Sequence, residues 1–470
     1  MVKSYEFIVI GSGPAGRRAA IQAAKLGHSV LVVEKGRRVG GVSVHSGTIP
    51  SKTLRETVLN LTGWRERGFY GRAYRVKDKI TAEDLMMRLH KTLDHEVDVL
   101  EHQFARNSVD TLRGMARFVD THRIEVTAET GEVHTFSGNN FLIAVGTHPF
   151  RPENVPFDGE NVYDSDDIIN MTRLPRSLTV VGAGVIGVEY ATIFSALDVP
   201  VTLVEPRRNL LDFVDREIIE EFTHILRDRG VTLRLGCTVT DVEMVDGRPV
   251  AVLDGMRRVR SDILLYAAGR TGATSALNLE ACGLVADARG RLAVEPNTYQ
   301  TAVPHIYAAG DVIGFPSLAS TSMEQGRIAA CHAFHVPAPP APDYFPYGIY
   351  AVPELSTVGM SEQEVQERGI PYECGIARFR ETSRGHIMGL DDGMMKMIIS
   401  LKTRRLLGVH IVGEGATELI HIGQAVMNLK GTLDYFIENT FNYPTLAEAY
   451  KIAALDAWNR MMPAPAPVST

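Results

Sequence analysis

Two stretches of the chain repeat one pattern of apolar strand, glycine-rich turn and helix, and this repeat limits the possible folds more than any other feature. Residues 7–16 read Phe-Ile-Val-Ile-Gly-Ser-Gly-Pro-Ala-Gly, and residues 178–187 read Leu-Thr-Val-Val-Gly-Ala-Gly-Val-Ile-Gly. Four apolar residues before a Gly-x-Gly-x-x-Gly turn are typical of the start of a βαβ unit. The sequence therefore predicts an α/β fold with two such units.

An acidic residue follows each repeat at the same distance. A second apolar stretch ends at Glu34 in the first unit and at Glu205 in the second, and 23 positions separate each acid from the first glycine of its turn, Gly11 or Gly182. In dinucleotide-binding units, an acid about 20 residues beyond this glycine accepts hydrogen bonds from ribose hydroxyls. The alternative is two structural glycine turns with surface acids. The common spacing favours two dinucleotide-binding sites.

The three glycines of each turn have distinct physical roles in such a unit. The first allows a tight turn, the second lets the backbone approach a pyrophosphate, and the third lets helix and strand pack closely. The free N–H groups of the helix N-terminus then face the phosphates. The residues in these roles are Gly11, Gly13 and Gly16 in the first unit and Gly182, Gly184 and Gly187 in the second.

Composition excludes several other classes of protein. The chain has 470 residues, enough for about three domains. Its net charge of −7 gives no indication of a positively charged surface that would bind nucleic acid. No stretch approaches the roughly 18 consecutive apolar residues of a membrane span, and no signal peptide precedes the first strand. The four cysteines form no Cys-x-x-Cys pair, so neither a disulfide framework nor a metal site is expected. These features predict a soluble, cytoplasmic protein.

Three further motifs complete a family resemblance. Thr301–Asp311 ends in Ile-Tyr-Ala-Ala-Gly-Asp, Gly40–Lys52 begins with Gly-Gly and ends in Ile-Pro-Ser-Lys, and Phe441–Glu448 reads Phe-Asn-Tyr-Pro-Thr-Leu-Ala-Glu. With the glycine turns, these motifs resemble the two-dinucleotide flavoprotein reductases, the family of glutathione reductase and lipoamide dehydrogenase, along essentially the whole chain. The resemblance implies FAD in the first unit, a nicotinamide nucleotide in the second, and a homodimer.

The resemblance also divides the chain into domains. It implies two Rossmann-like dinucleotide-binding domains and a C-terminal α+β dimerisation domain. The FAD-binding domain is discontinuous, at residues 1–150 and 281–345, and the NAD(P)-binding domain at residues 151–280 lies between its two parts. Residues 346–462 form the dimerisation domain, and residues 463–470 form a Pro-rich tail.

The sequence departs from the family at the positions that reduce disulfides. Disulfide reductases have two cysteines in the Gly-Gly motif, where this chain has Ser43 and Thr48, and their C-terminal His-Pro pair is Tyr443-Pro444 here. Hydroxyls cannot take two electrons from a flavin as a disulfide does, so disulfide reduction is excluded. Thr48 is either a hydroxyl donor near the flavin or a space-filling replacement. Tyr443 either shields the flavin edge or fills the place of the histidine.

Without a disulfide, the electrons must leave to a second soluble molecule. The strings Gly-Thr-Ile-Pro-Ser-Lys and Phe-Asn-Tyr-Pro-Thr-x-x-Glu-Ala-Tyr are similar to those of the soluble pyridine nucleotide transhydrogenases. This resemblance implies ping-pong hydride transfer from NADPH to NAD+ through flavin N5, in a transhydrogenase of the Si-specific type. Two alternatives stay open. One is an NAD(P)H diaphorase, quinone reductase or oxidase of the same fold, and the other is a non-enzymatic, flavin-bound redox sensor.

The resemblance assigns roles to single residues. Lys52 is expected near flavin N5, paired with Glu189, where its charge would stabilise the reduced anion; a structural ion pair between domains is the alternative. Asp311 is expected to bind the ribitol chain. The other predicted cofactor-binding residues outside the glycine turns are Glu34, Lys35, Gly36, Arg37, Arg38, Val39, Gly40, Gly41, Val42, Ser43, Thr48, Gly146, Gly269 and Ala319. For Arg37 and Arg38, the alternative is that they are solvated loop charges.

The second site must accept two nucleotides. Glu205 favours the free ribose hydroxyls of NAD, and a 2′-phosphate would face its carboxylate. Arg207 and Arg208 follow closely, and arginine suits bidentate binding of phosphate. We predict that Glu205 holds NAD(H) and that Arg207 or Arg208 offsets its charge when NADP(H) binds. Two solvated surface arginines are the alternative.

Overall fold

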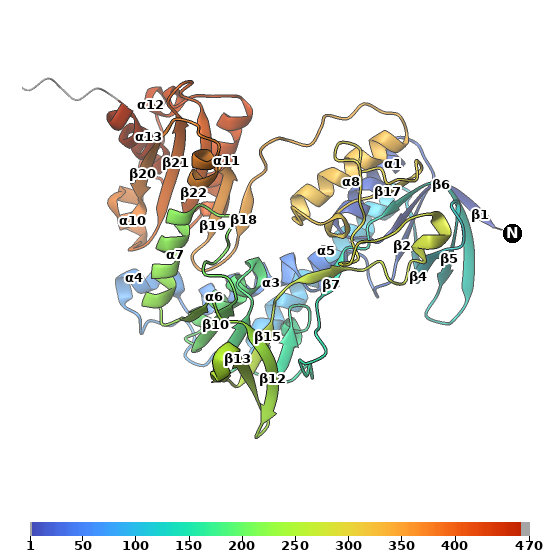
Figure 1. Ribbon diagram of the computed structural model, residues 1–470, viewed down its shortest axis with the longest axis horizontal. Helices are drawn as coiled ribbons and strands as arrows, with labels where there is room; N and C mark the ends of the chain where they lie inside the picture. The colour runs from blue at the N-terminus through green and yellow to red at the C-terminus, as the bar shows by residue number, and fades with distance from the viewer. Residues whose placement is uncertain (1, 462–470) are drawn as a thin grey trace, which may run out of the picture.

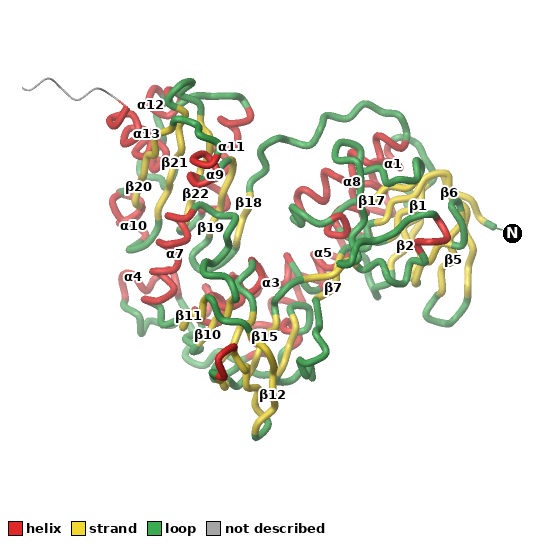
Figure 2. The backbone as a smooth tube through the Cα atoms, in the orientation of Figure 1, coloured by secondary structure: helices red, strands yellow, loops and turns green. Residues whose placement is uncertain are grey.

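The computed structural model describes residues 2–461, so the predicted tail at residues 463–470 lies outside the described residues. The strands form three large sheets, each with its own covering helices (Figure 1). Figure 2 shows the long loop that leads from the first of these bodies to the C-terminal one. Within residues 2–461, no helix is both long and apolar enough to cross a membrane.

The first sheet has the strand order β3-β2-β1-β6-β5-β4, with β17 added beside β6. Five of its strands run parallel: β1 (Lys3–Ile10), β2 (Val30–Glu34), β3 (Asp110–Arg113), β6 (Val133–Ile143) and β17 (Ile306–Ala308). The antiparallel strands are β4 (Met115–Phe118) and β5 (Arg123–Thr127). Because β17 follows the whole second sheet in sequence, the chain leaves this body and returns to it. The helices of this body are α1 (Pro14–Lys25), α2 (Gly41–His45), α5 (Ala82–Arg106) and α8 (Ala319–Ala333). Helix α3 (Thr48–Leu61) leads to the second body and packs against its core, and α4 (Arg67–Tyr70) lies near Asp198 of the second body and Gly389 of the third.

The second sheet is parallel, with the order β11-β10-β9-β15-β8. Its strands are β8 (Val162–Asp164), β9 (Leu178–Val181), β10 (Val201–Glu205), β11 (Thr232–Leu235) and β15 (Ile263–Tyr266), and its helices are α6 (Val185–Ala196) and α7 (Arg216–Asp228). An antiparallel sheet of β12 (Val239–Val245), β13 (Arg248–Leu253) and β14 (Arg258–Arg260) extends it. The connections to the first body pair as β7 (Thr147–Pro149) and β16 (Arg270–Gly272).

The third sheet is antiparallel, with the order β18-β19-β22-β21-β20. Its strands are β18 (Tyr347–Ile349), β19 (Leu355–Gly359), β20 (Tyr372–Arg378), β21 (Met394–Ser400) and β22 (Leu406–Val412). The helices are α9 (Glu362–Glu367), α10 (Ser383–Met388), α11 (Ala416–Asn428), α12 (Asp434–Glu438) and α13 (Glu448–Met461). Buried residues of β21, β22, α11 and α13 share one apolar core. The mixed α/β fold class predicted from the sequence is confirmed.

The two glycine turns have the conformation that their sequence requires. Gly11 and Gly182 have φ values of +104° and +99°. Residues other than glycine rarely adopt this backbone conformation. A Cβ at Gly16 would lie 1.9 Å from the carbonyl oxygen of Gly11, and a Cβ at Gly187 would lie equally close to that of Gly182. These contacts bring α1 and α6 against the ends of β1 and β9, so both helix N-termini lie at the carboxyl edge of a sheet.

Candidate functional site

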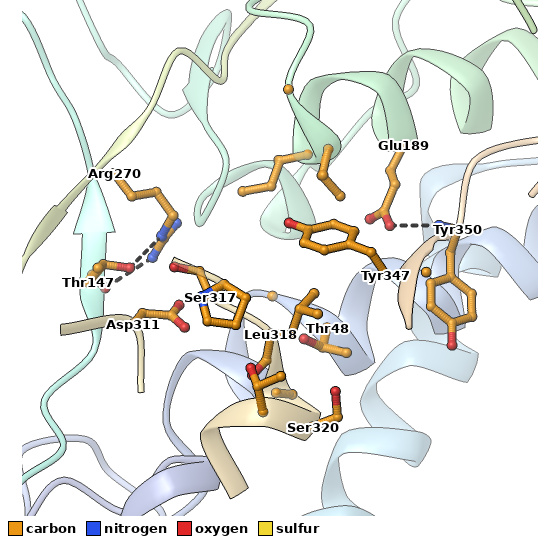
Figure 3. A pocket seen from close by; sticks show the side chains of 18 of the residues that line it. Thr48, Thr147, Glu189, Arg270, Asp311, Ser317, Leu318, Ser320, Tyr347 and Tyr350 are labelled. Carbon is orange, nitrogen blue, oxygen red and sulfur yellow. Dashed lines mark hydrogen bonds between the residues drawn. The ribbon is translucent and has the colours of Figure 1, made fainter. Parts of the chain in front are cut away.

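A cavity of about 1190 Å³ lies where the three bodies meet. Its walls include Thr48 of α3, Glu189 of α6, Asp311 after β17 and Tyr347 of β18 (Figure 3). The cavity therefore extends from the start of α3 and the segment after β17 to the glycine turn of the second unit, and the C-terminal domain closes one side of it.

The expected contact between Lys52 and Glu189 is present inside this cavity. The ammonium of Lys52 donates to both carboxylate oxygens of Glu189, at 2.8 and 2.7 Å. The backbone N–H of Tyr350 donates to the same carboxylate at 2.9 Å, and the Lys52 nitrogen lies 4.9 Å from the centre of the Tyr350 ring. The Glu189 side chain is 4 % exposed, against 25 % for Lys52. Glu189 therefore holds the cation, while part of Lys52 stays open to the cavity.

Asp311 is a half-buried acid that lines the cavity. Its carboxylate accepts no hydrogen bond from any residue in the range 2–461, and Figure 3 shows it facing the cavity near Arg270. Burial raises the pKa of Asp311, and the positive charge of Arg270 opposes that rise only in part. A half-buried carboxylate that faces a cavity can accept hydrogen bonds from a ligand bound there. A chain of hydroxyl groups, such as the ribitol of FAD, fits this position.

The first glycine turn leaves space beside it for a cofactor. A Cβ built on Gly13 or Gly146 meets no atom within 4 Å, which leaves both backbones open to a ligand. Glu34 organises this turn, because its carboxylate accepts hydrogen bonds from the N–H groups of Ser12 at 2.9 Å and Gly36 at 2.7 Å. These residues fit the phosphate and ribose part of a dinucleotide.

In the second unit, the acid predicted to bind the ribose and an arginine form one group. Glu205 accepts hydrogen bonds from the N–H of Ala183 at 2.6 Å and from the side chain of Arg207 at 2.7 Å. Burial opposes ionisation, but these hydrogen bonds hold the pKa of Glu205 below its ordinary value. Arg207 also reaches Asp212 at 3.4 Å. Arg207 therefore neutralises the acid at the position where a nucleotide phosphate would approach.

Some of the predicted catalytic and cofactor-binding residues line the cavity, and others do not. Those that line it are Val42, Thr48, Lys52, Gly182, Gly184, Glu189, Glu205, Arg207, Gly269, Asp311 and Ala319. The others are Gly11, Gly13, Gly16, Glu34, Lys35, Gly36, Arg37, Arg38, Val39, Gly40, Gly41, Ser43, Gly146, Gly187 and Arg208. Among these, Arg38 pairs with Asp94, Asp98 and Glu101 of α5, and the Ser43 hydroxyl donates to the Gly40 carbonyl. The guanidinium of Arg38 is thus held by acidic side chains of α5.

Several cavity residues were not found from the sequence. Arg270 donates to Thr147 at 2.8 Å and to Asp166 at 2.7 Å, which fixes it above Asp311. Tyr347 is the first residue of β18, and Tyr350 directly follows its last residue, Ile349. No local signal in the sequence showed that this segment faces the cavity.

Within residues 2–461 the cavity lining contains no sulfur relay, and its one histidine is His421 of α11, which shares a hydrogen bond with Gln424 at 2.9 Å. This lining includes no cysteine, and Cys282, Cys331 and Cys374 are buried elsewhere. Tyr443 is 70 % exposed, does not line the cavity, and shares a hydrogen bond with the hydroxyl of Ser383.

Comparisons with known proteins agree with this arrangement. Residues 5–326 match the family model "Pyridine nucleotide-disulphide oxidoreductase", and residues 345–454 match its dimerisation domain. The chain is similar to the soluble pyridine nucleotide transhydrogenase of Mycobacterium tuberculosis, at 51% identity over 98% of both chains. It is also similar to that of Vibrio parahaemolyticus, at 42% identity over 98% of this chain and 99% of the other.

Solved structures share the fold. The structure of LpdA from Mycobacterium tuberculosis is 25% identical, with a TM-score of 0.89 over 98% of this chain and 100% of the other. The flavoprotein disulfide reductase RclA from Escherichia coli is 26% identical, with a TM-score of 0.86 over 96% of this chain and 99% of the other.

Proposed function

Because the chain belongs to the pyridine nucleotide-disulphide oxidoreductase family, we propose that it is an FAD-dependent transhydrogenase that moves hydride from NADPH to NAD+. The observation that carries this proposal is a cavity whose lining includes the glycine turn of the second unit, Asp311 and the Lys52–Glu189 pair but no thiol. The electrons therefore have no sulfur acceptor within the cavity. The names and high identity of the relatives support the same activity.

The residues of the chain would bind and orient the two reactants. FAD, when bound, supplies a ring that accepts hydride from one nucleotide and returns it to another. Asp311 would accept from the ribitol hydroxyls, and the N-terminus of α1 would face the pyrophosphate. Lys52 would place a positive charge beside the ring, held there by Glu189, and would stabilise negative charge that develops during transfer.

One nucleotide site would serve both half-reactions in turn. The N-terminus of α6 would bind the nucleotide pyrophosphate, and Glu205 would accept from the ribose of NAD(H). When NADP(H) enters, Arg207 would turn part of its hydrogen bonding from Glu205 to the 2′-phosphate. The first nucleotide must leave before the second arrives, which is the ping-pong order.

The decisive assay follows electrons from NADPH to their acceptor. Anaerobic holoenzyme is mixed with NADPH and thio-NAD+, and formation of the reduced thio analogue is recorded. We expect rapid transfer to the analogue, together with slow oxygen consumption and slow quinone reduction in parallel reactions. Fast quinone or oxygen turnover without transfer to thio-NAD+ would instead identify a diaphorase or oxidase. No turnover with any acceptor would identify a redox-sensing protein.

We also propose that the chain works as a homodimer in the cytoplasm. The match of residues 345–454 to the dimerisation domain supports the dimer. The exposed position of Tyr443 supports a further step, in which Phe441–Glu448 reaches the cofactor of the second copy.

A further inference from the structure

Tyr347 projects into the cavity and has no assigned role. It is the first residue of β18, and Figure 3 shows its ring extending from the C-terminal domain into the middle of the cavity. Within residues 2–461, its hydroxyl makes no hydrogen bond, although the side chain is half-buried. The hydroxyl is therefore free to form a hydrogen bond with a ligand bound in the cavity.

The protonation state of Tyr347 makes it a donor. Burial, together with the carboxylates of Asp311 and Glu189, raises the pKa of Tyr347 to about 12. The phenol therefore keeps its proton at physiological pH and can donate a hydrogen bond to a neutral acceptor. Near the same cavity wall, the Lys52 ammonium is already engaged by Glu189.

A second aromatic residue holds the ring of Tyr347. The ring centres of Tyr347 and Phe213 lie 4.7 Å apart with an interplanar angle of 57°. Phe213 belongs to the segment between β10 and α7, next to Asp212, which pairs with Arg207. The aromatic pair therefore joins the C-terminal domain to the nucleotide-binding unit beside the cavity.

We infer that the Tyr347 hydroxyl donates a hydrogen bond to the carboxamide oxygen of the nicotinamide ring, so that Tyr347 is a positioning residue for both nucleotides. This inference rests on the proposed function, because it places a nicotinamide in the cavity. The carboxamide is identical in NAD and NADP, which differ only at the adenosine ribose. Tyr347 should therefore act equally on both, in contrast to Glu205 and Arg207.

The test compares ligands with and without the nicotinamide. Oxidised holoenzyme, in which no electron transfer occurs with oxidised nucleotides, is titrated calorimetrically with NAD+, NADP+ and ADP-ribose. Tyr347→Phe should weaken NAD+ and NADP+ by the same factor, about three- to tenfold for one neutral hydrogen bond, and leave ADP-ribose unchanged. Tyr266→Phe is the matched control, because this half-buried tyrosine packs edge-on against Phe157 at 5.9 Å and lies outside the cavity lining. It should change none of the three affinities.

Each other outcome overturns the inference. Unchanged NAD+ affinity in Tyr347→Phe would show that the hydroxyl does not bind the nicotinamide. Equal losses for NAD+ and ADP-ribose would mean that Tyr347 acts by holding the Phe213 segment. A shifted flavin spectrum or lower FAD content in the variant would assign the hydroxyl to the flavin. Because binding is measured without turnover, a wild-type enzyme that fails to reduce thio-NAD+ would overturn the transhydrogenase proposal separately.

Discussion

Lys52 is a cavity cation whose charge can be removed without changing the length of its side chain. Lys52→Met leaves Glu189 with only the Tyr350 N–H as a donor and removes the positive charge beside the proposed flavin ring. Loss of one preorganised electrostatic partner lowers rates by roughly 10²–10³. We expect stopped-flow reduction by NADPH to slow by that factor with FAD content unchanged. Lys52→Arg, which keeps the charge, should retain more of the rate, and an unchanged rate in Lys52→Met would assign the pair a structural role.

We expect Glu205 and Arg207 to determine which nucleotide is preferred. Arg207 lines the cavity and pairs with Glu205, whereas Arg208 does not line it. Replacing both arginines with alanine should weaken NADPH by about 1.5–3 kcal/mol, the scale of a hydrogen bond to a charged group, and hardly change NADH. Glu205→Ala should weaken NADH selectively. Equal losses of NADH and NADPH in the double variant, measured by titration, would contradict a divided site.

At the scale of secondary-structure elements, one buried lysine joins three of them. The ammonium of Lys396 in β21 lies 3.1 Å from Asp215 and 3.0 Å from Glu217 at the start of α7, and it also pairs with Glu362 of α9. The Lys396 side chain is 1 % exposed and that of Asp215 is fully buried. Asp215 also accepts from the N–H groups of Glu217 and Glu362, so it caps α7 and supports α9.

Breaking this cluster should strongly destabilise the fold. Lys396→Met leaves buried carboxylates without their cation, which costs about 3–5 kcal/mol of unfolding free energy. Chemical denaturation followed by circular dichroism measures the loss. Lys402→Met is the control, because Lys402 lies on an exposed turn after β21 and should change stability by less than about 0.5 kcal/mol. A similar, small effect in both variants would show that the cluster contributes nothing to stability.

The same cluster predicts how stability depends on pH. Burial opposes ionisation of both Asp215 and Glu362. The pKa of Asp215 is nevertheless below its ordinary value because of nearby His410, the hydrogen bond from the Glu362 N–H and the charge of Lys396, and the pKa of Glu362 is lowered chiefly by its hydrogen bond from Lys396. A lowered folded-state pKa stabilises the fold above the unfolded value, about 4, and this stability is lost as the pH falls through the folded value. Without Lys396 the carboxylates bind protons more readily. The deficit of Lys396→Met should therefore shrink between pH 7 and pH 4 in the same denaturation assay.

At the scale of the whole molecule, the cysteines lie away from the cavity. Burial raises the pKa of Cys282 and Cys331, and it raises that of Cys374 to about 12, so these thiols are poor nucleophiles at neutral pH. Treatment with iodoacetamide during turnover should leave transfer to thio-NAD+ unchanged, and glutathione disulfide should not be reduced. Disulfide reductase activity with native FAD would contradict the proposed route. Restoring cysteines at Ser43 and Thr48 should not create full activity, because Tyr443 replaces the histidine.

The local sequence was sufficient to predict the fold of the two glycine units. The turn has a positive φ at Gly11, and the helix that follows packs closely against this turn. Both features require glycine, so the glycines and their spacing predict the βαβ fold directly. The pairing of Lys52 with Glu189 followed from the family resemblance and is present at 2.7 Å. Their roles and those of the cofactor-binding residues stay predictions.

Only the tertiary structure decided which other side chains share the cavity. Tyr347 lies 158 positions from Glu189 (347 minus 189), and Arg270 lies 41 from Asp311 (311 minus 270), so no local period connects them. Likewise, Arg38 was grouped with the cofactor-binding residues by position, but α5 folds back and supplies three carboxylates to it. The sequence alone determined the backbone units, because turn geometry is a short-range steric property. The cavity walls depend on how separate domains pack, and that is decided by contacts between residues far apart in the chain.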